Sequence, residues 1–347
     1  MASLTQTRYW QEAAKSCIFL KVLVGSRARG LHASEAEVGA GLAKKVSDYD
    51  VRYVLDWPDA YRYVMGKTPP AVVSMPGEDA EAFELMKFMG LLYGSSSEAH
   101  EMLWSPVDYK GTHLFGTLLR QVRHKFTSKE LVSQLLGGAG FAPVSLVEQY
   151  MKTGESVELN SKGAGMLGRA VRYRKEDERE ARKALTDSVR RLLVAYHMMQ
   201  PFEAQESVAE YDFQKALKLA PSGVWDRNVT YYNGTLNLGM RLLQWDAEDD
   251  GRYYVYLPEG ERQALRDFRY GNSEAQWNTM LAFRNYVFTE VQELLVTSKL
   301  RAKPDPMWGA LFLRMFSDSR RAWHTEQDNN GWRAAWFYAG ETLNDDE

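Results

Sequence analysis

Two groups of residues near the start of the chain have the types and spacing needed to bind phosphate and a divalent cation. Gly25 and Ser26 directly follow an apolar run, and a glycine at a strand end lets backbone N–H groups approach an anion closely. Asp48 and Asp50 open a second strand-like run over residues 48–55. Residues two apart in a strand share a face, so both carboxylates can bind the same hard cation. The pattern indicates an enzyme that handles a metal and a triphosphate.

Composition limits the class of protein. The chain has 347 residues with a net charge of −3, which excludes a surface coated with basic residues but permits a local basic groove. Its length predicts two domains, residues 1–125 and 126–347. The single cysteine, Cys17, excludes an intrachain disulfide, and its place in an apolar run predicts a packing role. Since neither a membrane span nor a signal peptide is recognisable, we expect a cytoplasmic protein with no membrane contact.

The elements that must position the two groups have strand character in the first domain. Residues 17–24 and 48–55 have strand composition, and residues 71–73 and 80–83 can complete a small mixed sheet. A helix with an apolar face then begins near Leu85. We therefore expect an α+β unit built on a small mixed β-sheet.

Beyond the glycine-rich residues 137–140 the apolar spacing becomes that of helices. The clearest helix is predicted over residues 175–199, and another over 273–300. Residues 230–235 and 253–256 can form short strands. A mainly helical second domain is therefore expected.

Two further motifs in that domain are better explained by structure than by binding. Residues 163–168 spell G-x-G-x-x-G, but a charged helical run follows instead of a strand, so we expect a lead-in to a helix. The basic residues within 169–183 could track an RNA backbone, but acidic residues at helical spacing, such as Glu178 before Arg182, favour a surface helix with ion pairs. The histidines are scattered without zinc-binding spacing.

The bend and the Asp-x-Asp strand resemble the signature of the DNA-polymerase-β-like nucleotidyltransferase superfamily. More narrowly, four blocks in one order are similar to the RNA-ligase-associated predicted nucleotidyltransferase family of bacteria and phages: residues 25–30, 47–52, 83–87 and 101–106. The similarity is good over residues 17–110 and faint beyond, where Arg190-Arg191-Leu192-Leu193 is similar to the helical region of that family. The resemblance implies a polymerase-β-like nucleotidyltransferase domain followed by a mainly helical domain.

The same resemblance implies a metal site. Asp48 and Asp50 would bridge two Mg²⁺ ions, and Glu84 would complete the site as the third carboxylate. Glu84 stands where the family usually has aspartate, and Glu81 or Asp79 would replace it if the strand ended earlier.

The resemblance also implies contacts to the phosphates, and the chain departs from the family pattern in one connection. Gly25 and Ser26 would hold oxygens of the nucleoside triphosphate (NTP) substrate. Further candidates for phosphate contacts are the cationic residues Arg27, Arg29 and Lys87. Residues 31–46 form an insertion where the family usually has a short connection, and they can form a lid or a partner surface.

The implied activity is transfer of a nucleoside monophosphate from an NTP to a hydroxyl group, with release of pyrophosphate by two-metal chemistry. The association with RNA ligases implies an RNA or tRNA end as acceptor and a role in RNA repair. The alternative is a catalytically silent nucleotide-binding sensor or scaffold of a phage or RNA-repair assembly. The sequence leaves open the acceptor, the preferred NTP and the oligomeric state.

Overall fold

A computed structural model gives the fold of the chain. Some expectations lie outside the residues that it describes: the short strands at 230–235 and 253–256, and the alternative ligand Asp79. The described residues are 10–57, 68–75, 80–105, 119, 123–140, 147, 149, 152, 161–199 and 257–304.

The first unit is built on a four-stranded mixed sheet, as expected from the sequence. In the sheet order, the strands are β1 (Ile18–Val24), β2 (Asp50–Leu55), β4 (Glu81–Glu84) and β3 (Val72–Ser74). β2 runs antiparallel to β1 and parallel to β4, while β3 is antiparallel to β4. The α+β class of this unit is therefore confirmed.

Alternating apolar residues give the sheet two buried faces. On one face Val54 and Phe83 pack against helices α5 (Leu85–Tyr93) and α6 (Ser97–Trp104). On the other face Tyr53 joins a separate cluster that includes Cys17, which confirms a packing role for that cysteine. Since both faces are covered, the sites open to ligands are the ends of the strands.

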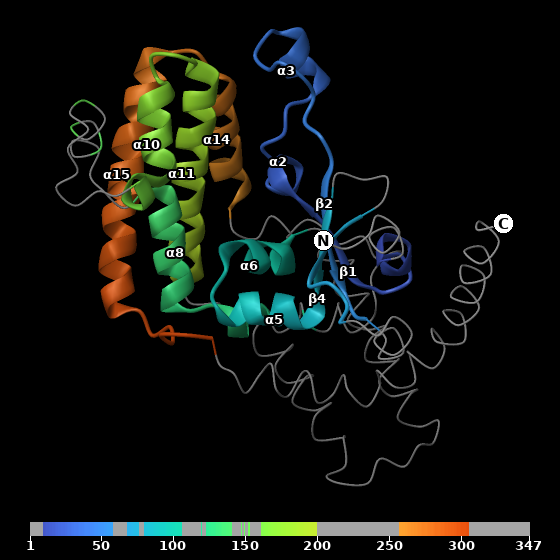
Figure 1. Cartoon of the computed structure of the whole chain (residues 1–347). Helices are drawn as coiled ribbons and strands as arrows, with labels where there is room; N and C mark the ends of the chain where they lie inside the picture. The colour runs from blue at the N-terminus through green and yellow to red at the C-terminus, as the bar shows by residue number, and fades with distance from the viewer. Residues whose placement is uncertain are drawn as a thin grey trace.

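The described helices that follow residue 126 form a bundle beside the sheet (Figure 1). The expected helices at 175–199 and 273–300 are confirmed as α11 and α15, and the largest hydrophobic core lies mainly among the bundle helices. The division between domains at residues 125 and 126 stays a prediction. The bundle helices are α8 (Lys129–Ala139), α10 (Ser161–Tyr173), α11 (Glu178–Met199), α14 (Glu259–Tyr270) and α15 (Glu274–Thr297).

The G-x-G-x-x-G motif lies within α10 and serves helix packing. Gly165 has a φ of 47° and interrupts the helical backbone there. A side chain at Gly165 would collide with the backbone of Gly137, Gly138 and Gly140 at the end of α8. Gly165 therefore permits a close contact between two helices.

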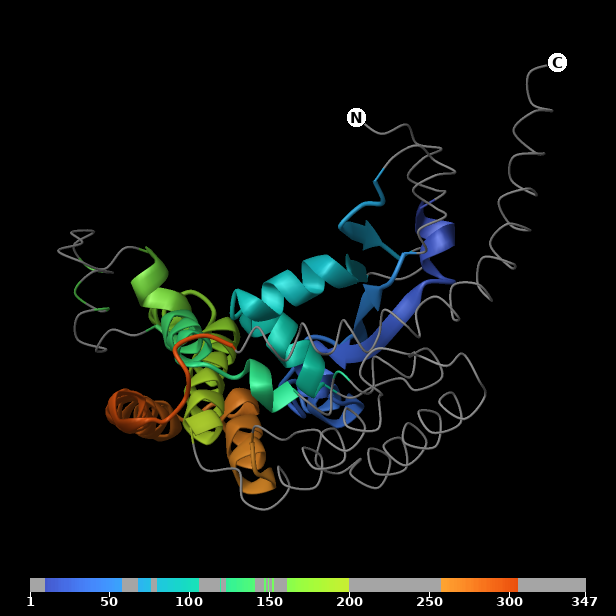
Figure 2. The ribbon, with the colours of Figure 1, turned by 90° about the horizontal axis from the view of Figure 1, so that it is seen from below.

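Helix α6 joins the two units. It contacts β1 of the sheet and α8 of the bundle, and the view from below shows the α5–α6 pair between them (Figure 2). None of the helices in the described ranges is both long and apolar enough to span a membrane.

Candidate functional site

The bend after β1 and the first residue of β2 meet at one end of the sheet. Val24 pairs with Asp50, so Gly25, which begins the short helix α2 (Gly25–Ala28), lies beside the Asp50 side chain. Gly25 has a φ of 72°, and a Cβ atom built on it would overlap the Asp50 carboxylate. A glycine is therefore required here both for the backbone conformation and for the space that Asp50 occupies.

Asp48 lies outside the strand on which we placed it. β2 begins at Asp50 because β1 ends at Val24, and no backbone is left there to pair with Asp48. The exposed Asp48 carboxylate instead accepts a hydrogen bond of 2.7 Å from Lys45. A pair this exposed contributes little stability, so the carboxylate is free to exchange Lys45 for a cation.

Glu84 lies at the end of β4 that is far from Asp50. It pairs with Leu55, roughly 16 Å along β2 from Asp50 at the usual rise of a strand. Its carboxylate accepts a hydrogen bond of 2.8 Å from the backbone N–H of Lys87 and so caps α5. The structure therefore does not bring Glu84 or Lys87 to the bend.

Glu81 lies nearer to Asp50 than Glu84 does. It pairs with Arg52, two residues from Asp50 on the same face of β2. The Arg52 guanidinium lies 4.0 Å from the Glu81 carboxylate and 3.6 Å from that of Glu98 on α6. Glu81, the alternative third carboxylate, is thus at the end of the sheet that carries Asp50.

The two arginines after the bend have different partners. The Arg27 Nε donates to the carbonyl oxygen of Ser47 at 2.9 Å, and its guanidinium covers the ring of Tyr49. Arg29 donates to both carboxylate oxygens of Glu101 on α6, at 2.6 and 2.9 Å, and also contacts Asp187 on α11. Arg27 therefore holds the segment before Asp50, whereas Arg29 connects α2 to α6 and to the bundle.

Asp187 is the centre of a partly buried charge network. It accepts hydrogen bonds from the Nε atoms of Arg190 and Arg191, at 3.0 and 2.9 Å. Burial alone would raise the pKa of Asp187, but the charges of Arg190, Arg191 and Arg29 outweigh it and hold that pKa below its ordinary value. Burial alone would also raise the pKa of Glu101, but the charges of Arg29 and Arg190 outweigh it and hold that pKa below its ordinary value. Both acids therefore stay ionised at neutral pH.

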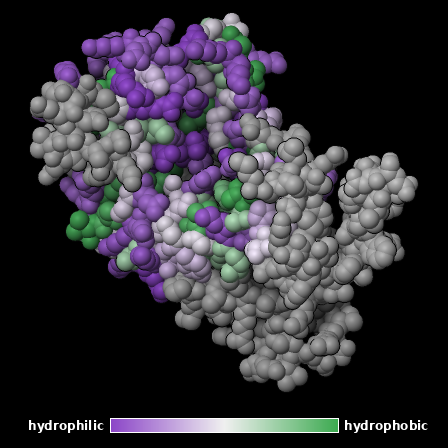
Figure 3. All heavy atoms as spheres, in the orientation of Figure 1, coloured by the Kyte–Doolittle hydropathy of each residue, from purple (hydrophilic) through white to green (hydrophobic). Residues whose placement is uncertain are grey.

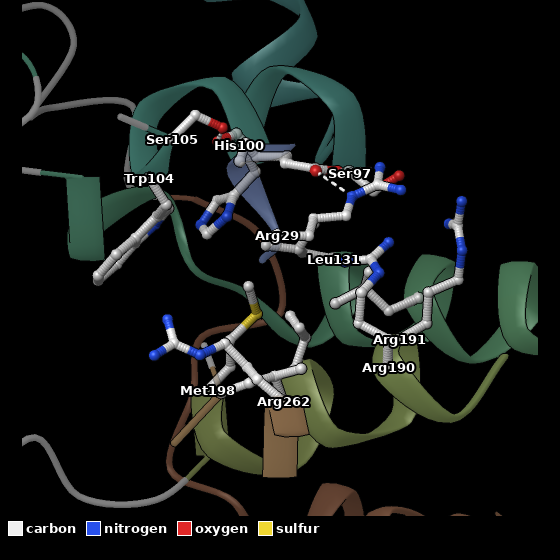
Figure 4. Close-up of a pocket in the computed structure, with 15 residues that line it drawn as sticks. Arg29, Ser97, His100, Trp104, Ser105, Leu131, Arg190, Arg191, Met198 and Arg262 are labelled. Atoms are coloured by element: carbon white, nitrogen blue, oxygen red, sulfur yellow. Dashed lines mark hydrogen bonds and ion pairs between the residues drawn. The ribbon is translucent and has the colours of Figure 1, made fainter. Parts of the chain in front are cut away.

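A pocket opens beside this network, between the sheet unit and the bundle (Figure 4). Its cavity volume is about 60 Å³, and the open solvent space above it brings the total to about 640 Å³. One wall is apolar and comes from bundle residues such as Leu131 and Met198, while Arg29, Arg190 and Arg191 line another part. The pocket thus offers both an apolar surface and guanidinium groups next to the bend.

The insertion at residues 31–46 is docked on the bundle. It contains α3 (Glu35–Gly39), and Glu37 forms an ion pair with Arg266 on α14. Further contacts are hydrogen bonds from Tyr270 to the carbonyl of Leu31 and from Arg179 to that of Gly41. In the structure the insertion therefore connects the bend to the bundle.

The basic run at 169–183 is used mainly for ion pairs, as expected from its interleaved charges. Arg174 pairs with Glu178 and Glu274, and Arg182 pairs with Glu178. The face of the bundle that is visible in the orientation of Figure 1 is largely hydrophilic (Figure 3). The exposed residues of the run agree with the expected surface helix with ion pairs. Arg182 does not, because it is buried and also donates to the carbonyl oxygens of Phe268 and Ser273.

The carboxylates at the bend fit a cation that takes its other ligands from a substrate. Within the described ranges, no three Asp, Glu, His or Cys side chains gather closely enough to hold a metal by themselves. Mg²⁺, however, is usually bound by one or two carboxylates together with substrate phosphates and water. Asp50 offers a hard oxygen ligand of that kind beside the backbone of Gly25, and Asp48 lies two residues before it in an exposed pair with Lys45.

Sequence reasoning did not identify Glu101, Asp187, Arg190 and Arg191 as part of the site. Their signal was present in part, because Glu101 lies in one of the four family-like blocks and Arg190-Arg191 in the run that is similar to the helical region of that family. The sequence does not show that these residues contact one another, because Arg29 bonds to acids that lie 72 and 158 residues away along the chain.

Comparison with known families agrees with this geometry. A family model described as RlaP, RNA repair pathway DNA polymerase beta family, matches residues 9–200, more than half of the chain. Comparisons with curated proteins and with solved structures gave no match. The matched span contains the bend, Asp50, α6 and the Arg190-Arg191 pair, and it confirms the resemblance to polymerase-β-like nucleotidyltransferases. The chain belongs to the RNA repair pathway DNA polymerase beta family.

Proposed function

We propose that this protein is a Mg²⁺-dependent nucleotidyltransferase that moves a nucleoside monophosphate from an NTP to a hydroxyl group, with an RNA or tRNA end as acceptor. The single observation that carries the proposal is the contact between the Asp50 carboxylate and the backbone of Gly25. It puts a ligand for a hard cation beside a bend that can receive phosphate oxygens. Membership of an RNA repair family supports the acceptor class.

Each residue at the bend would have a distinct part in binding the donor. The backbone N–H groups of Gly25 and Ser26 would donate hydrogen bonds to the terminal phosphates. Asp48, after release from Lys45, and Asp50 would hold the cations. When bound, Mg²⁺ supplies neutralisation of phosphate charge and activation of the attacking hydroxyl. Arg27 would keep residues 47–49 against the bend through its bond to Ser47.

The third carboxylate is proposed to be Glu81 and not Glu84. Glu81 lies at the same end of the sheet as Asp50, whereas the Glu84 carboxylate caps α5 at the other end. Replacement of Arg52 as the partner of Glu81 is feasible because that pair is long, at 4.0 Å, and Glu81 is more than half exposed.

The experiment is incorporation of α-labelled NTPs into a mixed RNA pool in the presence of Mg²⁺. Asp50→Asn should lower the rate at least about 100-fold, because a charged ligand of the cations is lost. Glu81→Gln should lower the rate similarly, and Glu84→Gln, its matched control, should leave it within a few fold. Circular dichroism checks that each variant is folded. Nucleotide binding without turnover in the unmodified protein would instead support the sensor alternative.

A further inference from the structure

We propose that Lys45, near the end of the insertion, is a phosphate-binding residue of the donor site. A metal ion that binds Asp48 displaces the Lys45 ammonium group, which then contacts the triphosphate. This inference deepens the proposed function and rests on it, because it assigns a further binding residue to the same site. It depends on where the Lys45 backbone is held, on what its side chain contacts and on the charges that a metal–NTP complex brings.

The backbone that carries Lys45 is held beside the bend. Two residues later, the Ser47 N–H donates to the carbonyl oxygen of Ala33 at 3.1 Å, and the Ala33 N–H donates to the Ser47 hydroxyl at 2.8 Å. The Ser47 carbonyl oxygen in turn accepts the bond of 2.9 Å from Arg27 on α2. The segment with Lys45 is therefore joined directly to the element that begins with the bend.

The Lys45 side chain can change its partner although its backbone is held. It is 74% exposed, and its ammonium donates a hydrogen bond of 2.7 Å to Asp48, whose side chain is 66% exposed. A pair this exposed is weak, because water solvates both groups almost as well as they solvate each other. The flexible four-carbon stem can therefore turn the ammonium group toward another anion.

A metal–NTP complex gives Lys45 a reason to change its partner. A divalent cation and an ammonium group repel each other, so the two compete for the Asp48 carboxylate. The charge of Asp50 also acts on the Lys45 ammonium, and a metal ion would neutralise that attraction as well. The phosphates that complete the coordination of Mg²⁺ put new anionic oxygens beside the displaced ammonium group.

The two arginines after the bend are less suited to this exchange. Arg27 donates to Ser47, 20 residues away in sequence, and Arg29 is bonded to both carboxylate oxygens of Glu101 on α6. Release of either arginine would break a contact that joins distant segments of the chain. Release of Lys45 breaks only a pair between residues three apart in sequence.

The test measures binding at equilibrium in two titrations of the full-length protein, with no acceptor present. In the first, Mn²⁺ is added alone, and its free concentration is followed by electron paramagnetic resonance. In the second, a non-hydrolysable NTP is added at a constant, saturating concentration of Mn²⁺, and binding is followed by calorimetry. The two titrations separate the competition for the metal from the contact with the phosphates.

Lys45→Gln should have effects of opposite sign in the two titrations. Mn²⁺ alone should bind about two- to fivefold more tightly, because the competing ammonium group is gone. The NTP should bind about tenfold more weakly, because a charge-assisted hydrogen bond to a phosphate is lost. Inorganic tripolyphosphate with Mn²⁺ should lose affinity by the same factor, because the contact involves the phosphates and not the nucleoside.

Lys44→Gln is the matched control. Lys44 is the neighbouring lysine, is also 74% exposed, and pairs at 3.6 Å with Asp177, the residue before α11. Its substitution removes the same charge but should change both affinities by less than about twofold, because its pair lies on the bundle. Lys45→Arg keeps the charge and should retain NTP affinity within about threefold. Circular dichroism checks that each variant is folded.

Unchanged or tighter NTP binding by Lys45→Gln would overturn the inference, because Lys45 would then only compete with the metal. Equal losses in Lys44→Gln and Lys45→Gln would also overturn it, since net charge alone would explain them. The proposed function fails separately, in the transfer assay. A protein that binds Mn²⁺ and NTP with the expected dependence on Lys45 but transfers nothing would contradict the enzyme and leave this inference standing.

Discussion

Gly25 and Asp50 depend on each other at the scale of single residues. The left-handed backbone at Gly25 turns the chain out of β1, and the absent side chain leaves the space that the Asp50 carboxylate fills. Either feature alone would favour glycine. Together they make this position the most sensitive one in the proposed donor site.

Replacement of Gly25 by alanine should therefore remove activity and cost stability. The positive φ alone costs about 1–2 kcal/mol for a residue with a Cβ atom, and displacement of Asp50 should lower the transfer rate at least about 100-fold. Gly90→Ala, within α5, is the matched control, because a Cβ there meets no atom within 4 Å. It should keep activity and gain about 0.5–1 kcal/mol. Urea unfolding and the transfer assay measure both effects; normal activity in Gly25→Ala would refute the donor site.

The sequence predicts the neighbourhood of the bend and Asp50, where local chemistry decides it. The strand before Gly25 and the pairing of the bend with Asp50 follow from apolar alternation and from the resemblance. The position of Asp48 does not, since the start of β2 is fixed by the residue at which β1 ends. The position of Glu84 is also decided by tertiary structure, because the register between β2 and β4 sets which acid lies near Asp50.

At the scale of elements, the insertion is the feature that the sequence describes least well. Its length suggests a lid or a partner surface. Its helix α3, however, is joined to α14 by the hydrogen-bonded ion pair of Glu37 and Arg266, which lie 229 residues apart in sequence. The same segment continues directly to Ser47 and Asp48. The insertion therefore positions the residues before β2, and only contacts over such distances could have revealed this.

Stability at acid pH should report on this contact. The hydrogen bond from Ser34 and the contact with Arg266 outweigh burial and lower the pKa of Glu37 to about 2, from an ordinary value of 4.5. A depressed pKa stabilises the fold fully above pH 4.5, and that stabilisation is lost as the pH falls toward 2. Burial and the charges of Arg266 and Arg27 lower the pKa of the neighbouring His32 below its ordinary value.

Glu37→Gln should remove that dependence on pH. The variant should unfold in urea with a free energy about 2 kcal/mol lower at pH 7, because a partly buried charged hydrogen bond is lost. Between pH 4.5 and 2 the difference from the unmodified protein should shrink. Lys15→Gln, which breaks an exposed pair with Glu12, serves as control and should change stability by less than about 0.5 kcal/mol. A difference that stays constant with pH would contradict the assigned role of Glu37.

At the scale of the whole molecule, the sheet unit and the bundle are joined by charges as well as by packing. Arg29, the C-cap residue of α2, binds Glu101 on α6 and Asp187 on α11, while α6 contacts both β1 and α8. The sequence predicts each unit from its own periodicity. Their relative position needs contacts between residues that no local pattern connects.

Asp187→Asn should weaken the connection between the units. Three arginines would lose their shared carboxylate in a partly buried place, which should lower the free energy of unfolding by about 3 kcal/mol. Urea unfolding followed by two probes, far-ultraviolet circular dichroism and tryptophan fluorescence, should show transitions that no longer coincide. Coincident transitions with unchanged stability would mean that the network does not hold the units together.

The central claim is that cations and the triphosphate meet between Gly25 and Asp50. The most direct test is a crystal structure of the protein with a non-hydrolysable NTP and Mn²⁺, in which anomalous scattering locates the ions. We predict Mn²⁺ bound to Asp50 and Asp48, with the terminal phosphates on the backbone of Gly25 and Ser26. Ions and phosphates bound elsewhere, with the Asp50 carboxylate facing water, would contradict the account.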